Sequence, residues 1–234
     1  MKFAEPLVGG RLVKRYKRFL ADVVLDGDGS EITAHCANPG SMLGLKEPGA
    51  RVWLSPSNNP KRKLKYSWEI IEADGVLVGI NTSHPNKLVE EAIEDGRIGE
   101  LSGYASLKRE VKYGKNSRID ILLEDSDGGR TYVEVKNVHL MRQPGLAEFP
   151  DSVTARGAKH LGELADMVAE GHRAAMVFLV QRPDCERLSL AEDIDPAYAA
   201  AFRSARNAGV DVYAIGCDIR LDGIDAVKPV TITI

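Results

Sequence analysis

The stretch SRIDILLEDSDGGRTYVEVK, residues 117–136, determines the fold that we predict for this chain. Two apolar segments flank residues 125–129, whose Asp, Ser and Gly residues are typical of a hairpin turn. Side chains alternate between the two faces of a strand, so Ile119, Ile121 and Leu123 are expected to share one face. The stretch therefore predicts two antiparallel strands that lie in the core of a domain.

The register of this hairpin brings two carboxylates together. A five-residue turn pairs Glu124 with Arg130, and counting outward then places Asp120 opposite Glu134. Opposed residues on one face have Cβ atoms roughly 4.5–5.5 Å apart, so the two carboxylates repel each other unless a cation binds between them. Oxygen ligands of this kind suit Mg²⁺ or Mn²⁺, and Lys136 is expected to point to the same place. We interpret the pattern as a site that holds a metal ion and a water molecule against a phosphodiester. The alternative is the solvated face of an ordinary hairpin, because the motif is short.

The composition is that of a globular protein. The 234 residues are 44% hydrophobic and 28% charged, which allows one large domain or two modest ones with a proper core. No apolar run approaches the roughly 20 residues that span a bilayer, and residues 1–20 do not have the pattern of a signal peptide. Cys36, Cys185 and Cys217 are widely spaced, which argues against a disulfide framework and against a zinc site. These features predict a cytoplasmic protein with no membrane partner.

Basic residues gather in two segments, although the net charge is −3 and the sequence pI about 6.0. Residues 11–18 read RLVKRYKR and residues 61–65 read KRKLK. The aromatic residues among or beside them are Tyr16, Phe19, Tyr66 and Trp68. Such clusters are typical of surfaces that bind phosphates and stack bases, although many basic runs are only solvated faces. The nucleic-acid contacts predicted here are Arg15, Lys17, Arg18, Lys61, Arg62 and Lys63.

Residues 1–82 read as short strands separated by turns. Five short strands without a long helix predict a small, partly open barrel of the OB type, whose usual ligands are single-stranded nucleic acids or oligosaccharides. A helix over residues 12–23 is the competing interpretation, because its apolar residues also fit helical spacing. The expected strands are residues 15–25, 31–36, 51–55, 64–73 and 76–81.

A polar loop follows the second expected strand. Residues 34–45 read AHCANPGSMLGL, and the Asn-Pro-Gly-Ser sequence indicates a turn. The turn would bring His35, Asn38 and Ser41 together as hydrogen-bonding groups beside a basic barrel. We predict that they contact a phosphate or a base. The alternatives are an ordinary loop and a buried structural histidine.

Residues 85–234 alternate between helices and strands, which predicts a mixed sheet flanked by helices. The fold class is therefore α/β (α+β), with one domain over residues 1–84 and a second over residues 85–234. A helix-turn-helix over residues 199–220 is rejected, because DVYAIGCDI alternates and is rich in β-branched residues. The second helix is expected to be capped by Asp151 or Ser152. The expected elements are a helix (87–95), a strand (107–113), the hairpin, a helix (153–170), a strand (174–180), a helix (196–207) and a strand (210–217).

Longer blocks of the sequence carry a family resemblance. The order of helix, three strands with the Asp and Glu-x-Lys residues, helix and strand resembles the PD-(D/E)xK nuclease superfamily. Nearly the whole chain is similar to the sugar fermentation stimulation protein A family. The resemblance implies an OB-like N-terminal domain, a nuclease-like C-terminal domain, DNA binding and a role in regulating sugar-utilisation genes. The similar blocks are RYKRFLADV (15–23), HCANPGSM (35–42), NPKRKLKYSWE (59–69), LSGYASLKREVKYG (101–114), SRIDILLE (117–124), YVEVKNV (132–138) and FPDSVTARGAKHLGEL (149–164).

The superfamily pattern also implies roles for individual residues. Asp120 and Glu134 would be the ligands of Mg²⁺ or Mn²⁺, and Lys136 would orient or deprotonate the attacking water or stabilise negative charge. Glu91, on the preceding helix, would be an additional acid. The chain has Ile-Asp where the name of the superfamily has Pro-Asp, a departure that leaves the predicted metal ligands in place.

Further basic residues are expected near the carboxylates. Arg156 and His160 are four residues apart on a predicted helix and share a face with Lys159. Arg118 opposes Lys136 in the predicted register, an arrangement that suits two side chains facing a phosphate. The alternatives are a solvated helix face and a structural histidine.

We therefore predict a DNA-binding protein whose cleft hydrolyses phosphodiester bonds. The predicted partner is double- or single-stranded DNA without strong sequence specificity, and a homodimer is an open alternative. Two other functions stay open: a regulator that binds DNA without cleaving it, and a nucleotide- or oligosaccharide-binding protein on the same scaffold.

Overall fold

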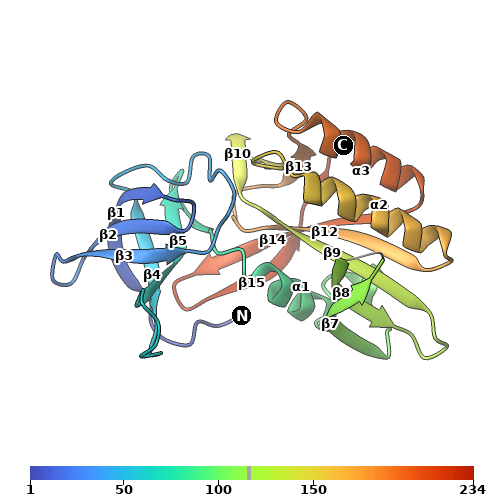
Figure 1. The fold of residues 1–234 in the computed structure, drawn as a ribbon, viewed down its shortest axis with the longest axis horizontal. Helices are drawn as coiled ribbons and strands as arrows, with labels where there is room; N and C mark the ends of the chain where they lie inside the picture. The colour runs from blue at the N-terminus through green and yellow to red at the C-terminus, as the bar shows by residue number, and fades with distance from the viewer. Residues whose placement is uncertain (115–116) are drawn as a thin grey trace.

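The N-terminal part of the chain is a barrel (Figure 1), in a computed structural model that describes residues 1–114 and 117–234. The strands pair in the order β3-β2-β1-β4-β5, and an additional pairing of β3 with β5 closes the barrel; β6 extends it beyond β5. The predicted five-stranded OB-like barrel is confirmed, and the helix over residues 12–23 is excluded. The strands are β1 (Val8–Tyr16), β2 (Leu20–Leu25), β3 (Glu31–Cys36), β4 (Arg51–Pro56), β5 (Tyr66–Ala73) and β6 (Val76–Gly79).

The strand predicted over residues 15–25 is wrong, because a tight turn divides this segment. β1 ends at Tyr16 and β2 begins at Leu20. Lys17 and Arg18 between them have φ angles of 47° and 62°. L-residues rarely adopt positive φ, so a turn without Gly or Asn gave no signal in the sequence.

The C-terminal part is built on a mixed six-stranded sheet with the order β15-β14-β12-β9-β8-β7. β12 is parallel to β9 and β14, whereas β7, β8 and β9 form an antiparallel meander. The predicted mixed sheet flanked by helices is confirmed. β14 occupies the second half of the rejected helix-turn-helix, where that motif would need a helix. The elements are α1 (Pro85–Glu94), a 3₁₀ turn (Gly99–Leu101), β7 (Ser106–Tyr113), β8 (Ser117–Glu124), β9 (Arg130–Val138), α2 (Ala155–Ala169), β12 (Arg173–Val180), α3 (Pro196–Asn207), β14 (Asp211–Arg220) and β15 (Gly223–Pro229).

Four short strands form a further sheet that the sequence analysis did not predict. They are β10 (Leu140–Gln143), β11 (Leu146–Phe149), β13 (Arg187–Leu190) and β16 (Thr231–Ile232). Each has only two to four residues, which is too short for an alternating pattern to show.

The main sheet separates two apolar layers. α1 packs against one face with Val133, Val135 and the inward residues of β12, while α2 and α3 pack against the other face. The predicted alternation holds for Ile121 and Leu123, which lie on the α1 side. It is wrong for Ile119, which packs on the α2 side. The regular alternation of side chains between the two faces is therefore broken at Asp120, between Ile119 and Ile121.

The predicted caps of the second helix are also wrong. Thr154 is the N-cap of α2, and its hydroxyl accepts a hydrogen bond from Gly157 N at 3.0 Å. Asp151 instead accepts one from Met42 N, and the main-chain carbonyl of Asp151 accepts another from Ser41. The residues before α2 therefore bind the barrel instead of capping the helix.

The boundary between the two parts lies in a short segment. β6 ends at Gly79 and α1 begins at Pro85, and the division after residue 84 stays a prediction.

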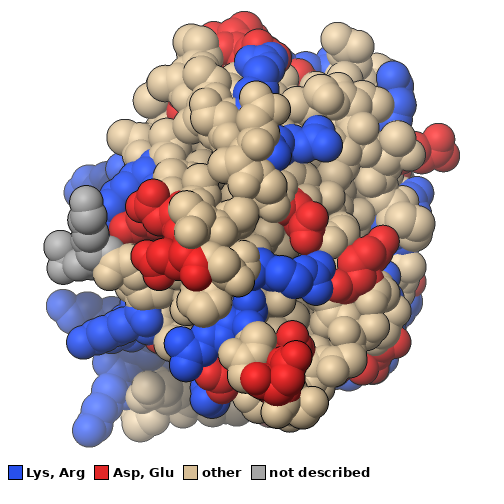
Figure 2. All heavy atoms as spheres, turned by 90° about the vertical axis from the view of Figure 1, so that its right-hand side faces the viewer, with Lys and Arg blue, Asp and Glu red and all other residues tan. Residues whose placement is uncertain are grey.

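Within the described residues, no helix is both long enough and apolar enough to cross a membrane. Cys36, Cys185 and Cys217 are buried free thiols. Acidic and basic side chains are mixed over the end of the molecule that carries the edge of the main sheet (Figure 2), so this face has no field of a single sign.

Candidate metal and nucleic-acid site

The predicted hairpin opens at the position of the two carboxylates. β8 and β9 pair from Glu124 with Arg130, as predicted, to Ile121 with Val133, where the ladder ends. Asp120 is therefore not a ladder partner of Glu134, which corrects the predicted register at this end of the hairpin. Its Oδ2 instead accepts a hydrogen bond from Val135 N at 2.8 Å. Because a carboxylate takes the place of a main-chain partner, the two strands separate and leave space between them. The predicted opposition of Arg118 and Lys136 is absent for the same reason.

Glu134 is the most buried acid of the site, with 2% of its surface exposed. Its Oε1 accepts hydrogen bonds from Lys136 Nζ, at 2.7 Å, and from His160 Nδ1. Arg156 Nε donates to the other ring nitrogen of His160 at 3.3 Å. The second oxygen, Oε2, is buried and has no hydrogen-bond partner among the described residues. Lys136 and His160 thus hold one oxygen of Glu134, with Arg156 behind His160, while the other oxygen is left unused.

The two carboxylates differ in pKa. Burial raises the pKa of Asp120, and the negative charge of Glu134 raises it further. Burial would also raise the pKa of Glu134, but the hydrogen bond from His160 and the charge of Lys136 outweigh this effect and lower it. Glu134 is therefore the carboxylate that is held ionised. A cation beside Asp120 would offset the burial and the repulsion that raise the pKa of Asp120.

These residues line a cleft of about 590 Å³ between the barrel and the main sheet. One wall comes from β8, β9 and the start of α2, and the other from Arg18 and the loop of residues 38–40. The cleft brings together seven of the residues predicted from the sequence, which lie far apart along the chain. They are Arg18, Asn38, Asp120, Glu134, Lys136, Arg156 and His160.

Two further residues approach Asp120 that the sequence analysis missed. Asn86 Nδ2 donates to Asp120 Oδ1 at 2.8 Å and lies 3.4 Å from Glu110 Oε1. Glu110 interrupts β7 between the partners of Ile119 and Ile121 and has a φ of 55°. Positive φ is rare for a glutamate, and here it interrupts the pairing of β7 with β8 without a change of register. The Pro-Asn helix start was the available signal for Asn86, whereas nothing in the sequence indicated the positive φ of Glu110.

Glu91, the predicted additional acid, lies elsewhere. Its carboxylate is 2.7 Å from the amino group of Met1 and 3.8 Å from Lys87 Nζ. It is not among the residues that line the cleft in the described part of the chain. Glu91 follows Asn86 by five residues, which places it about 140° around the helix axis, on a different face of α1 from the one that contacts Asp120.

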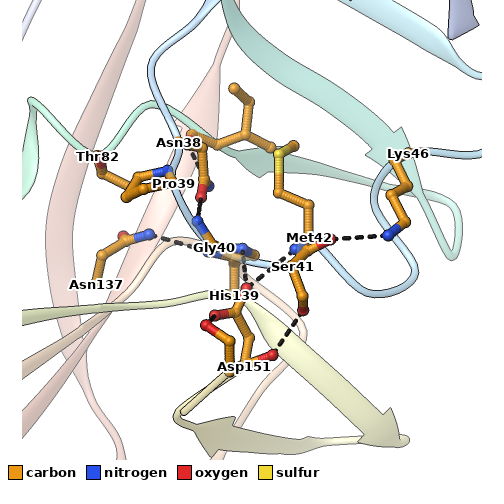
Figure 3. A network of polar contacts seen from close by, with 12 residues as sticks. Asn38, Pro39, Gly40, Ser41, Met42, Lys46, Thr82, Asn137, His139 and Asp151 are labelled. Carbon is orange, nitrogen blue, oxygen red and sulfur yellow. Dashed lines mark hydrogen bonds and ion pairs between the residues drawn. The ribbon is translucent and has the colours of Figure 1, made fainter. Parts of the chain in front are cut away.

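The Asn-Pro-Gly-Ser loop fastens the barrel to the C-terminal part (Figure 3). Asn38 is buried, and its side chain bonds Ile80 O and Gly40 N. Ser41 Oγ donates to Asp151 O at 2.6 Å. A Cβ at Gly40 would lie 2.5 Å from Asp151 Oδ2, so any larger residue would push the Asp151 carboxylate out of its present position. These contacts join the two parts of the chain; Asn38, Gly40 and Asp151 also line the cleft, whereas Ser41 is not among its described lining residues.

Two of the predicted basic contacts support the same loop. Arg15 donates to the carbonyls of Arg18, Asn38 and Gly40 at 2.8–2.9 Å. Arg18 donates to Pro39 O at 2.9 Å and lines the cleft. Arg15 therefore stabilises the loop through its carbonyls, while Arg18 lies in the cleft, where a ligand could contact it.

The remaining predicted contacts lie outside the cleft in the described structure. Lys159 Nζ approaches Ser117 Oγ and Glu163 Oε1, and Arg118 is exposed on β8. His35 stacks on Phe19, and Arg62 donates to Ser67 Oγ at 2.6 Å. Lys17, Lys61 and Lys63 are exposed on the barrel.

Comparison with known proteins identifies the family. The model of the "Sugar fermentation stimulation protein RE domain" matches residues 83–223, and that of the "SfsA N-terminal OB domain" matches residues 13–80. A sugar fermentation stimulation protein homolog from Rhodospirillum centenum is 62% identical over 224 residues, 96% of each chain. One from Brucella ovis is 60% identical over 232 residues, 99% of this chain and 97% of the relative. The solved structure of Pyrococcus furiosus SfsA in complex with Ca²⁺ superposes with a TM-score of 0.90 at 29% identity, over 100% of this chain and 98% of that chain. This chain therefore belongs to the sugar fermentation stimulation protein family.

Proposed function

We propose that this protein binds DNA in the cleft and hydrolyses phosphodiester bonds there with a divalent metal ion. The observation that carries the proposal is the unused Oε2 of Glu134, buried in the cleft. A buried carboxylate oxygen without a partner is costly. A cation between Asp120 and Glu134 would remove that cost and the repulsion between the two acids.

The donor set fits Mg²⁺ or Mn²⁺. The described residues contain no group of three or more His, Cys, Asp or Glu side chains arranged around one point. Mg²⁺ is commonly held by only one or two carboxylates, with water and substrate phosphates completing its shell. In an extended strand the C=O of a residue points to the same side as its N–H, so the carbonyl of Val135 faces the side of Asp120. Pyrococcus furiosus SfsA, whose solved structure contains Ca²⁺, supports a divalent cation for this scaffold.

The other residues would prepare the site for hydrolysis. When bound, the cation supplies Lewis-acid stabilisation of the charge that develops on the phosphate. His160, itself held by Arg156, fixes Oε1 of Glu134 and leaves Oε2 available to a cation. Lys136 lies on the same strand two residues further, where its ammonium group can orient the attacking water or stabilise the phosphorane-like charge.

Local charge supports a nucleic acid as the ligand. The net charge of −3 gives no general attraction to DNA, but Arg18 and Arg156 line opposite walls of the cleft together with Lys136. We infer a DNA partner without strong sequence specificity, because phosphate contacts carry no sequence information. A role in regulating sugar-utilisation genes, a homodimer and a cytoplasmic location stay proposals.

The test is a panel of fluorescent single- and double-stranded DNA and RNA, incubated with Mg²⁺, Mn²⁺, Ca²⁺ or EDTA. We expect strand breaks with Mg²⁺ or Mn²⁺ that Lys136→Ala abolishes. Lys112→Ala, which removes an exposed lysine of β7, is the matched control and should cleave normally. Salt-sensitive binding without cleavage in either metal would instead identify a non-catalytic DNA-binding protein. Binding that salt leaves unchanged would point to an uncharged ligand such as an oligosaccharide.

Asn86→Ala is expected to weaken Mn²⁺ binding by roughly 10- to 100-fold, as loss of an outer hydrogen bond to a metal ligand typically does. The reason is that Asn86 fixes Asp120 from the side opposite to Val135. Calorimetric titration of Mn²⁺ measures the effect, with Lys87→Ala on the next position of α1 as the control. An affinity equal to that of the control would show that Asp120 does not depend on Asn86.

A further inference from the structure

The two basic segments of the barrel meet on one outer surface, around a pair of stacked rings. Phe19 and His35 stack with their ring centroids 6.5 Å apart and their planes 21° from parallel. His35 pairs with Leu20 of β2 on one side and with Ser67 of β5 on the other. Paired residues share a face of the sheet, so these positions lie outside the barrel, opposite the buried Cys36 and Trp68. We call Phe19 and His35 the ring platform.

Cations flank the ring platform on both sides. Lys17 and Arg18 precede Phe19, and Arg62 reaches Ser67, the strand partner of His35. Among the described residues, none of these cations forms an ion pair with a carboxylate, and neither do Lys61 and Lys63. By contrast, Lys14 of β1 is paired with Asp22. The unpaired positive charge at this surface favours the binding of an anionic ligand there.

The ring platform is held rigidly. Phe19 O accepts a hydrogen bond from Cys36 N at 2.8 Å, and Arg15 binds the carbonyl of Arg18 at 2.9 Å. The turn at Lys17 and Arg18 adopts positive φ at both residues, a conformation that costs free energy for L-residues. The turn presents Arg18 to the cleft and leaves 45% of Phe19 exposed.

We propose that an unpaired nucleobase stacks on the exposed face of Phe19, so that the ligand of the cleft is a single-stranded nucleic acid. Stacked aromatic rings interleaved with cations match the alternation of bases and phosphates along a single strand. In a duplex the bases are already stacked on one another and cannot cover a protein ring. Arg18 adjoins Phe19 and lines the cleft, so a strand on the ring platform leads toward Asp120 and Glu134. The inference rests on the proposed nucleic-acid binding but not on cleavage.

The test uses the full chain and a DNA oligonucleotide that carries 2-aminopurine, whose fluorescence is quenched when the base stacks. EDTA is present throughout, so cleavage does not occur. We expect Phe19→Ala to weaken single-strand binding by roughly 10-fold or more, the range for loss of one stacked base, and to abolish the quench. Phe19→Trp should retain both. Leu221→Ala, a change at a residue of similar exposure in the C-terminal part, is the matched control and should bind like the unaltered protein.

Duplex DNA and single-stranded RNA of the same sequence are the comparison ligands. Weak duplex binding that Phe19→Ala leaves unchanged supports the proposal, and the tighter of the DNA and RNA single strands identifies the sugar that the site prefers. The proposal is overturned if Phe19→Ala binds single strands as tightly as Leu221→Ala does. An equal loss for duplex and single strand overturns it as well. A quench without cleavage in the metal panel would support base stacking on the ring platform and contradict the proposed nuclease activity. Cleavage without a quench would support the nuclease activity and contradict the stacking.

Discussion

Glu134→Gln is expected to lower metal-dependent cleavage by roughly 100- to 1,000-fold, the usual loss when one preorganised electrostatic group is removed from an active site. Glutamine keeps the shape of glutamate but removes the negative charge. Its amide nitrogen cannot bind a cation, and one of its two terminal atoms must face Lys136 and His160, both of which now donate to Oε1. The variant is therefore expected to lose both the metal and the ordered donors around it. Single-turnover cleavage and Mn²⁺ titration measure the two losses separately.

The matched control for this change is Glu124→Gln, in the same hairpin. Glu124 is ion-paired with Lys108 and Arg130 at the turn end of β8 and β9, away from the cleft. This variant should cleave at nearly the normal rate. If Glu134→Gln binds Mn²⁺ and cleaves like the control, the carboxylate pair is a structural feature and the catalytic hypothesis fails.

The hairpin illustrates what the sequence can and cannot predict. Alternation and turn composition are local properties, so the pairing of Glu124 with Arg130 and the buried faces of β9 followed from them. The end of the ladder is set by tertiary contacts. Asn86 and Val135 both bind the Asp120 carboxylate, and the pairing of β7 with β8 is interrupted at Glu110 and Asp120. The nature of the ligands could thus be predicted, whereas the opening between the strands could not.

The two walls of the cleft show the same limit over a longer range. Ser41 and Asp151, which join the barrel to the C-terminal part, are separated by 110 positions. No periodicity or turn signal relates residues so far apart, and the sequence around Asp151 predicts only a local role as the cap of a helix. The position of Glu91 beside Met1 and Lys87 could not be predicted for a related reason, since helical spacing gives the faces of α1 but not which face meets β8.

Phe178→Ala is expected to destabilise the protein by about 3–5 kcal/mol, the usual cost of removing a buried aromatic ring. Phe178 is fully buried in β12, and its ring centroid lies 5.5 Å from that of Phe149 and 6.0 Å from that of Phe202. It is the ladder partner of Lys136 on β9, so the two side chains share the α2 face. Since whole domains are stable by only about 5–15 kcal/mol, a loss of this size is a large part of the total.

Urea unfolding at neutral pH measures this loss, with Phe178→Leu as the control that keeps most of the volume and should lose less than about 1.5 kcal/mol. The expected effect on function is different. Glu134 and Lys136 are held mainly by contacts with each other and with His160, not by the ring beneath them. At a temperature where Phe178→Ala stays folded, its Mn²⁺ affinity should therefore be close to normal. A loss of stability below about 1 kcal/mol would place the ring outside the core. A large loss of Mn²⁺ affinity in the folded variant would mean that the packing under β9, and not the polar network, positions the carboxylates.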